Sequence, residues 1–359
     1  MTSATRRLSK THTILGVVLM APLLVTTVTG ILLGWYDQLR YATEPYGLSS
    51  PSEVRLSPTA LVTAIQDRYP NHRLETLFMA IESSRAVRAK LGSPSPLTLF
   101  LHPASGAVLG TRTPAQRDWV DLLYDLHPGK TFGVAGQVTT AVTALGIAVL
   151  WGLGIAMWYV RRANTVRTVP ALSWRTTAFH RWAGFWVGLP LIALTGLGAA
   201  LNFAGSLIAT FDPPPNVIPT GPRPSPLELA LLAETQAPLY RPASLERIIF
   251  PKHDTDPVQL RYADGGWMFL DGYRGRVLDS KGPIAHWARS LYPLHSGRFF
   301  GFAGPWLVAC LGLILLTAVI TGIIFSWRLR SRFRARDRRK VPGEEFLRPT
   351  EQSSMKSSP

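Results

Sequence analysis

A histidine-containing pattern that occurs twice constrains the fold of this chain more than any other feature. The pattern is H-x-G-[K/R]-x-F-G-x-A-G, and its two copies begin at His127 and His295. Both copies directly precede a long apolar stretch. Self-similarity at a fixed distance predicts that one structural unit is used twice.

A second set of matched residues lies upstream of each copy. Its members share their order along the chain, and the first two spacings are identical: His12, Gly16 and Pro22 in one copy, and His180, Gly184 and Pro190 in the other. The next match, Thr29-Gly30 with Thr195-Gly196, is offset by two residues. The repeat therefore covers two stretches of each half.

Four long apolar stretches account for a hydrophobic content of 47%. Each is about as long as the 20 residues that a helix needs to cross the hydrocarbon core of a bilayer, and none contains Lys, Arg, Asp or Glu. The first is too long for a cleaved signal peptide and has no A-x-A-like site before Trp35, so we interpret it as a retained anchor. The stretches are Thr13–Tyr36, Val134–Tyr159, Trp182–Leu207 and Phe302–Trp327.

Two polar segments of similar size separate these stretches, so the order is helix, domain, helix, link, helix, domain, helix. We predict an α-helical membrane protein with four transmembrane helices in two tandem repeats and two small α+β extracytoplasmic domains. The predicted parts are the N-terminus with the first helix (1–36), first domain (37–133), second helix (134–160), link (161–180), third helix (181–207), second domain (208–301), fourth helix (302–327) and basic tail (328–359).

The distribution of charge predicts the orientation in the membrane. Basic residues gather at the N-terminus, in the link and in the tail, whereas each large polar segment carries 10 basic and 9 acidic residues. Loops that stay in the cytoplasm are enriched in Lys and Arg. We therefore expect both termini inside and both domains outside.

The net charge of +16 has the same origin, because most of it lies in those three short cytoplasmic pieces. A basic tail beside a membrane is attracted to anionic lipid headgroups, so we expect the lipid bilayer and no nucleic acid as a partner. The single cysteine, Cys310, excludes an intrachain disulfide.

Both polar segments follow one plan of a helix followed by short strands. The first helix is predicted near Ser57–Tyr69, with Ser57 as its cap, and the second begins near Ser225-Pro226. Because these cores are small, we expect the two units to pack on each other or on the membrane face. The predicted strands are Leu74–Ile81, Ala86–Leu91, Leu97–Leu101 and Val108-Leu109, and then Leu245–Phe250, Val258–Tyr262, Trp267–Leu270 and Val277-Leu278.

These motifs resemble the PepSY-associated transmembrane family over about Leu8 to Arg332. The resemblance rests on H-R-W-x-G at His180, on H-x-G at His295 and on T-G-x-x-x-x-W at Thr321, and it favours the FoxB-like siderophore-reductase branch. The first copy departs from the pattern, because His12-Thr13-Ile14 stands where His-Arg-Trp is usual. The resemblance implies PepSY-like outward domains, bound haem, the bacterial inner membrane and reduction of ferric siderophores on the periplasmic side.

The topology places the repeated histidines in two layers. His12 and His180 share the cytoplasmic edge, and His127 and His295 share the outer edge. Parallel repeats are related by an axis along the membrane normal, so each pair can face itself across that axis. Two opposed neutral imidazoles suit haem iron, and we predict two haem b groups, each with two histidine ligands.

Basic residues beside the histidines are candidates for binding haem propionates. Lys130 and Arg298 follow the outer histidines by three residues, and Arg181 follows His180. Each has an ordinary alternative as an interfacial residue, and a boundary histidine alone often hydrogen-bonds a helix end. Likewise, the repeated glycines near the histidines serve either cofactor clearance or helix packing.

Three functions are compatible with this pattern. The first is a haem-dependent ferric-siderophore reductase, which passes electrons outward to a ferric siderophore or other ferric chelate. The chain has no flavin or nicotinamide fingerprint, so this function requires a separate electron donor, a quinol or a reductase. The alternative is a non-enzymatic, membrane-anchored PepSY binding or regulatory protein. A carrier of the siderophore itself ranks last, because charged residues and broken helices are not predicted within the membrane.

Overall fold

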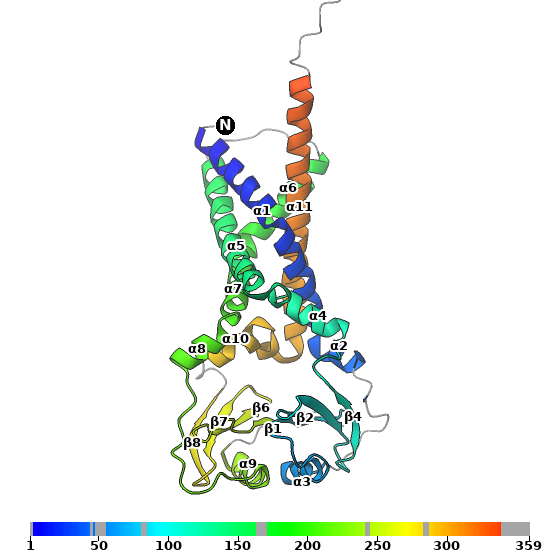
Figure 1. Ribbon diagram of the computed structural model, residues 1–359. Helices are drawn as coiled ribbons and strands as arrows, with labels where there is room; N and C mark the ends of the chain where they lie inside the picture. Colours follow the sequence, from blue (N-terminus) through cyan, green and yellow to red (C-terminus); the bar gives the residue numbers. More distant parts are fainter. Residues whose placement is uncertain are drawn as a thin grey trace, which may run out of the picture.

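The computed structural model describes residues 3–43, 46, 55–79, 85–162, 171–240, 245–282 and 287–338. Figure 1 shows three layers: a bundle of long helices, a row of short helices, and a β-sheet backed by two further helices. Parts of the predicted cytoplasmic link and of the basic tail lie outside the described residues.

Long apolar helices form the bundle. Helix α1 (Ser3–Leu33) contacts α5 (Gly133–Arg162) and α11 (Gly304–Arg338), while α6 (Ala171–Trp186) contacts α11, and α7 (Gly188–Leu201) contacts α5. In the described part of the chain, three helical segments are long and apolar enough to cross a membrane, and a bent pair makes a fourth if it counts as one span. The segments are Thr5–Leu33, Lys130–Val160 and Trp287–Phe325, and the bent pair is Ala178–Trp186 with Gly188–Leu201.

The third apolar stretch is bent, which corrects the expectation of one straight helix over 181–207. Helices α6 and α7 meet at an angle of 62°. Pro190 supplies no backbone N–H for the ladder, and proline is a usual cause of such kinks. At the bend, a Cβ on Gly188 would lie 2.0 Å from Cδ1 of Trp151, so the close approach of α5 requires glycine there. In the first half, Pro22 lies inside α1 without breaking it, and Met20 stands where the second half has Gly188.

Short helices between the bundle and the sheet were not predicted from the sequence. They recur in both halves at the same separation, because α2 begins at Tyr36 and α8 at Ala204, 168 residues later. A capping box of Asp118 and Asp121 begins one of these helices, and that D-x-x-D pattern is a signal in the sequence. The short helices are α2 (Tyr36–Thr43), α4 (Trp119–Leu126), α8 (Ala204–Phe211) and α10 (Trp287–His295), with 3-10 turns η1 (Lys130–Phe132) and η2 (Arg298–Ala303).

The strands of both halves form a single antiparallel sheet of eight strands in the order β4-β3-β2-β1-β5-β6-β7-β8. The halves join between β1 and β5, where Leu77 pairs with Ile248 and Phe78 pairs with Arg247. The two units thus pack on each other, as expected, but through a shared sheet. The strands are β1 (Leu74–Phe78), β2 (Val87–Leu91), β3 (Leu97–Leu101), β4 (Val108–Arg112), β5 (Leu245–Ile249), β6 (Val258–Tyr262), β7 (Trp267–Asp271) and β8 (Arg276–Lys281).

Helices α3 (Pro58–Arg68) and α9 (Pro226–Tyr240) cover the sheet face that lies away from the bundle (Figure 1). The predicted cap is confirmed, because the Ser57 hydroxyl accepts a hydrogen bond of 3.3 Å from the backbone N–H of Ala60. One apolar core joins both helices to both halves of the sheet. Its fully buried side chains include Leu61, Ile65, Leu77, Leu99, Ile248, Leu260 and Met268.

The glycines of the repeated motif form a tight turn at the start of α5 and α11. Gly129 and Gly297 have φ values of +82° and +79°, in the left-handed region that favours glycine. A Cβ on Gly136 would lie 2.1 Å from the carbonyl oxygen of Gly129, and Gly304 meets Gly297 in the same way. Backbone therefore packs on backbone across each turn. This contact accounts for Gly129 and Gly136, and for Gly297 and Gly304.

Replacing Gly136 with alanine should destabilise the protein, because the new methyl group overlaps the Gly129 carbonyl. We expect a loss of about 1–3 kcal/mol in unfolding free energy, measured by denaturant unfolding in detergent. Gly196→Ala is the matched control, because a Cβ there meets nothing within 4 Å. Equal stability of the two variants would contradict this explanation of the motif.

Candidate functional site

Two histidines from opposite halves face each other at the sheet end of the bundle. His127 caps the C-terminus of α4, His295 ends α10, and their ring centroids are 5.9 Å apart. Nδ1 of His127 lies 3.0 Å from the carbonyl oxygen of Thr26, and Nδ1 of His295 lies 2.9 Å from that of Leu194. A carbonyl only accepts, so each Nδ1 carries the proton and donates it. Each Nε2 therefore keeps a lone pair for a ligand bond. We call these two residues the proximal pair.

A glycine on the neighbouring helix provides the space for each proximal ring. A Cβ on Gly30 would lie 2.8 Å from Cε1 of His127, and one on Gly198 would lie 2.7 Å from Cε1 of His295. The equivalent glycines are therefore Gly30 and Gly198, which are 168 residues apart, as are the two histidines. The two-residue offset inferred from Gly196 is wrong, and the repeat is in exact register here.

A second pair lies farther from the sheet. His12 on α1 and His180 on α6 have ring centroids 6.2 Å apart, and their planes are nearly perpendicular, at 89°. Nδ1 of His180 lies 3.2 Å from the carbonyl oxygen of Ala318 and 3.2 Å from the hydroxyl of Thr321. We call His12 and His180 the distal pair. In both layers, the structure thus places side by side the two histidines that the repeat predicts to face each other.

A glycine follows each distal histidine by one helical turn. Gly184 lies one turn beyond His180, and a Cβ there would meet nothing within 4 Å. At the matching position, a Cβ on Gly16 would have Leu150 at 4.0 Å as its nearest neighbour. The helix surface beside both distal histidines is therefore free of close side-chain contacts, and at Gly184 it is exposed.

The separation of the rings fits a shared metal ion. A metal–nitrogen bond of about 2 Å on each side, with a further ~1 Å from nitrogen to ring centre, puts the centroids roughly 6 Å apart. Within the described residues, no three His, Cys, Asp or Glu side chains form a metal-binding group. Each pair offers two imidazole nitrogens, which is the number of protein ligands that haem iron takes in bis-histidine sites.

The predicted propionate-binding residues of the outer layer lie close to the proximal pair in sequence and have aromatic neighbours. Nζ of Lys130 lies 5.4 Å from the ring centre of Tyr124, and the guanidinium of Arg298 lies 5.6 Å from that of Tyr292. Lys130 is exposed, whereas Arg298 is half-buried. These contacts are equivalent in the two halves, so a cation stands over an aromatic ring at both positions.

Arg298 also connects the two halves directly. It donates a hydrogen bond of 2.6 Å to Asp37, which belongs to α2 of the first half. The residue equivalent to Asp37 in the second half is Gly205, so Lys130 has no matching acid at that position.

The third predicted residue, Arg181, is exposed on α6 beside His180. Propionate binding by these three residues stays a prediction.

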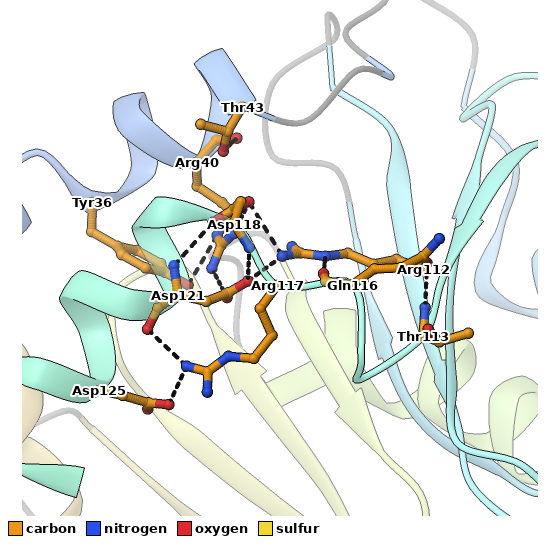
Figure 2. Close-up of polar contacts among 10 residues, drawn as sticks. All are labelled: Tyr36, Arg40, Thr43, Arg112, Thr113, Gln116, Arg117, Asp118, Asp121 and Asp125. Carbon is orange, nitrogen blue, oxygen red and sulfur yellow. Dashed lines mark hydrogen bonds and ion pairs between the residues drawn. The ribbon is translucent and has the colours of Figure 1, made fainter. Parts of the chain in front are cut away.

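An ion-pair network holds the helix that carries His127 (Figure 2). Arg40 of α2 contacts both Asp118 and Asp121 at the start of α4, at 2.8 Å in the case of Asp118, and Arg112 of β4 contacts the same two acids. The Arg40 side chain is only 8% exposed. The network thus connects α2 and strand β4 of the sheet to α4, the helix that ends at His127.

The ionised form of Asp121 is favoured within this network. Burial alone would raise the pKa of Asp121, but the hydrogen bonds from Arg40 and from the backbone of Asp118 hold that pKa below its usual value. The second half has a different ion pair, because Arg289 stands at the position of Asp121, Ile208 stands at the position of Arg40, and Arg289 pairs with Asp212 at 3.6 Å. Sequence reasoning missed both ion pairs, because they join segments far apart in the chain.

Comparison with known families now adds to this geometry. Residues 2–162 and 177–347 match the family described as PepSY-associated TM region. The chain belongs to this family. The predicted resemblance is confirmed at that level, and the two matched segments correspond to the two halves of the internal repeat. No curated protein matches the chain in a sequence comparison.

Replacing Arg40 with alanine should destabilise the junction between the bundle and the sheet, because Asp118 and Asp121 lose a buried partner. We expect a loss of about 3 kcal/mol in unfolding free energy, typical of breaking a buried ion pair. Arg117→Ala is the matched control. Its ion pair joins the residue just before the N-cap of α4 to Asp125 on that helix and is half-exposed, so its loss should cost less than about 1 kcal/mol. Similar losses in both variants would contradict a central role for Arg40.

The same network predicts a pH dependence. Because the pKa of Asp121 is lowered in the folded state, its ionised form stabilises the fold above the ordinary carboxyl pKa of about 4. This contribution is lost as the pH falls through the folded-state pKa. The stability difference between the unmodified protein and Asp121→Asn should therefore shrink as the pH falls below about 4. A constant difference in unfolding curves across that range would contradict this assignment.

Proposed function

We propose that this PepSY-associated membrane protein is a di-haem oxidoreductase of the bacterial inner membrane. It passes electrons across the membrane to a ferric siderophore or another ferric chelate on the periplasmic side. The observation that supports this proposal is the presence of two facing histidine pairs, at 5.9 and 6.2 Å, at different depths in the bundle. One pair lies toward the sheet, and the other lies toward the opposite end.

In this proposal, the four histidines would hold two haem b groups, with one pair of histidines for each. The carbonyls of Thr26, Leu194 and Ala318 accept from Nδ1 of three of them, which orients each ring and makes Nε2 a better donor. When bound, the cofactor supplies one-electron redox chemistry. In this proposal, Lys130 and Arg298 neutralise propionates at the proximal pair, and Arg181 does so at the distal pair.

The proposed orientation places the sheet in the periplasm and both termini in the cytoplasm, with the bent pair α6–α7 as the fourth span. Basic residues at the N-terminus and in the link support this orientation. The distal pair then lies on the cytoplasmic side, where a quinol or a separate reductase donates electrons. One electron converts ferric to ferrous iron, which oxygen chelators hold less tightly, so the metal is released.

A binding or regulatory module without haem is the second candidate, and one observation favours it. An apolar recess of about 280 Å³ lies between α3 and α9, on the side of the sheet away from the bundle. It is lined by residues that include Met79, Val87, Leu245 and Pro238, with Arg55 and Glu234 at its polar side. Such a recess suits an apolar segment of a partner, but this role leaves the paired histidines unexplained.

Purification from detergent extracts separates the two candidates. We expect haem absorption bands in the purified protein, and a haem-to-protein ratio that falls by about half in single histidine variants, since each pair holds one of two haems. His127→Ala and His295→Ala should remove the same haem, and His12→Ala and His180→Ala the other. His253→Ala is the control, because that histidine is exposed and remote from both pairs.

Electron transfer is then tested with the same preparations. Anaerobically reduced protein should be reoxidised by a ferric chelate, as followed by the optical spectrum, and the His127→Ala variant should be at least tenfold slower, because an obligatory site is lost. A colourless protein, or full haem content in all four histidine variants, would refute the proposal and leave the binding module as the better explanation.

A further inference from the structure

The sheet face that points toward the bundle carries a row of basic and aromatic side chains. Strand side chains alternate between faces, and the opposite face packs on α3 and α9 with residues such as Leu77 and Ile248. The register places five residues of the other face directly side by side across five neighbouring strands. In order from β2 to β7, they are Arg88, Phe78, Arg247, Arg261 and Trp267, which we call the basic row.

The aromatic members of the row lie beneath cations. The ring of Phe78 has three of them within 6 Å of its centre: Arg247 at 4.5 Å, Arg88 at 5.1 Å and Lys90 at 5.6 Å. At the other end, Arg261 and Arg289 stand 5.8 and 4.7 Å from the ring of Trp267. Guanidinium groups stack on aromatic faces, so the row combines flat aromatic groups with positively charged groups.

Two arginines in the middle of the row are held by one carboxylate. Arg247 and Arg261 are directly opposite each other on neighbouring strands, an arrangement that is unfavourable for like charges. Both share a single carboxylate, that of Glu246, at 3.5 and 3.3 Å. Burial lowers the pKa of Arg247, and repulsion from Arg261 adds to this effect.

The row is connected to the proximal histidines. Its buried end meets Arg289 of α10, and α10 ends at His295, so those two positions are about 9 Å apart along the helix. Arg298, next to the proximal pair in sequence, also acts electrostatically on Arg247. The other end is open, because Lys90 is exposed. A ligand bound at this open end, beside Lys90 and Phe78, therefore lies on the sheet face that points toward the bundle and the proximal pair.

We propose that the basic row is a binding site for a multiply charged anionic metal chelate with aromatic donor rings, such as a tris-catecholate complex. Cations compensate the charge of the chelate, and its rings stack on the guanidinium and aromatic groups. The inference rests on the proposed function for the identity of the metal as ferric iron. It adds a preference, because neutral or cationic chelates lack the charge that these residues require.

Binding is tested with gallium(III), which takes the place of ferric iron in such chelates but accepts no electron under these conditions. Isothermal titration calorimetry on the full chain in neutral-lipid nanodiscs should detect the triply anionic gallium tris-catecholate. A neutral gallium tris-hydroxamate of similar size should bind at least tenfold more weakly. The affinity for the anionic chelate should fall with added salt, because exposed charges are screened.

Variants locate the site. Lys90→Gln and Arg88→Gln should each weaken binding by roughly tenfold, the cost of one lost charge-assisted contact. Arg68→Gln is the matched control, because it removes one positive charge from α3 on the opposite face of the sheet. Lys90 is exposed, so its replacement leaves the fold intact even if the variants at Arg247 or Arg261 do not fold.

Three outcomes would overturn the inference. The two gallium chelates bind equally well, or Lys90→Gln and Arg68→Gln have equal effects on binding. In the third outcome, the row binds the lipid of anionic nanodiscs and no chelate. Because gallium binding requires no haem, these outcomes are distinguishable from failure of the proposed function. A haem-containing protein that reduces chelates but fails the gallium test refutes only the basic row. A protein that passes the test without haem refutes only the reductase.

Discussion

The contact between an imidazole and a glycine on the neighbouring helix determines the geometry of the proposed site. Gly30 and Gly198 allow His127 and His295 to approach α1 and α7 so closely that their Nδ1 atoms reach backbone carbonyls. A side chain at either glycine would collide with the ring. Because both contacts are repeated in register, the two rings meet across the approximate twofold axis of the molecule with their Nε2 atoms available.

The remaining structure maintains this arrangement from the side of the sheet. The Arg40 network fixes α4, the Arg289–Asp212 pair connects α10 to the end of α8, and Arg298 joins α10's end to Asp37 of the other half. The shared sheet then prevents the halves from separating, since β1 and β5 form its centre. The ion pairs therefore differ between the two halves, whereas the backbone geometry around the histidines is the same in both.

The sequence predicts the elements of this protein better than their association. Ser57-Pro58 identified the start of α3, and Leu97–Leu101 and Val258–Tyr262 match their strands residue for residue, because caps and alternation are local signals. The fusion into one sheet depends on Leu77 meeting Ile248, and the need for glycine at the bend depends on the contact of Gly188 with Trp151, both contacts between distant segments. The pairing of the histidines followed from the repeat itself, whereas the carbonyls that orient them required the structure.

The most direct test of the central claim is a high-resolution cryo-electron microscopy map of the purified protein. The account predicts planar density centred on a metal between His127 and His295, with each Nε2 at coordination distance and each Nδ1 still on the carbonyl of Thr26 or Leu194. A second such density should lie between His12 and His180. Maps in which only lipid or packed side chains separate these rings would contradict the account.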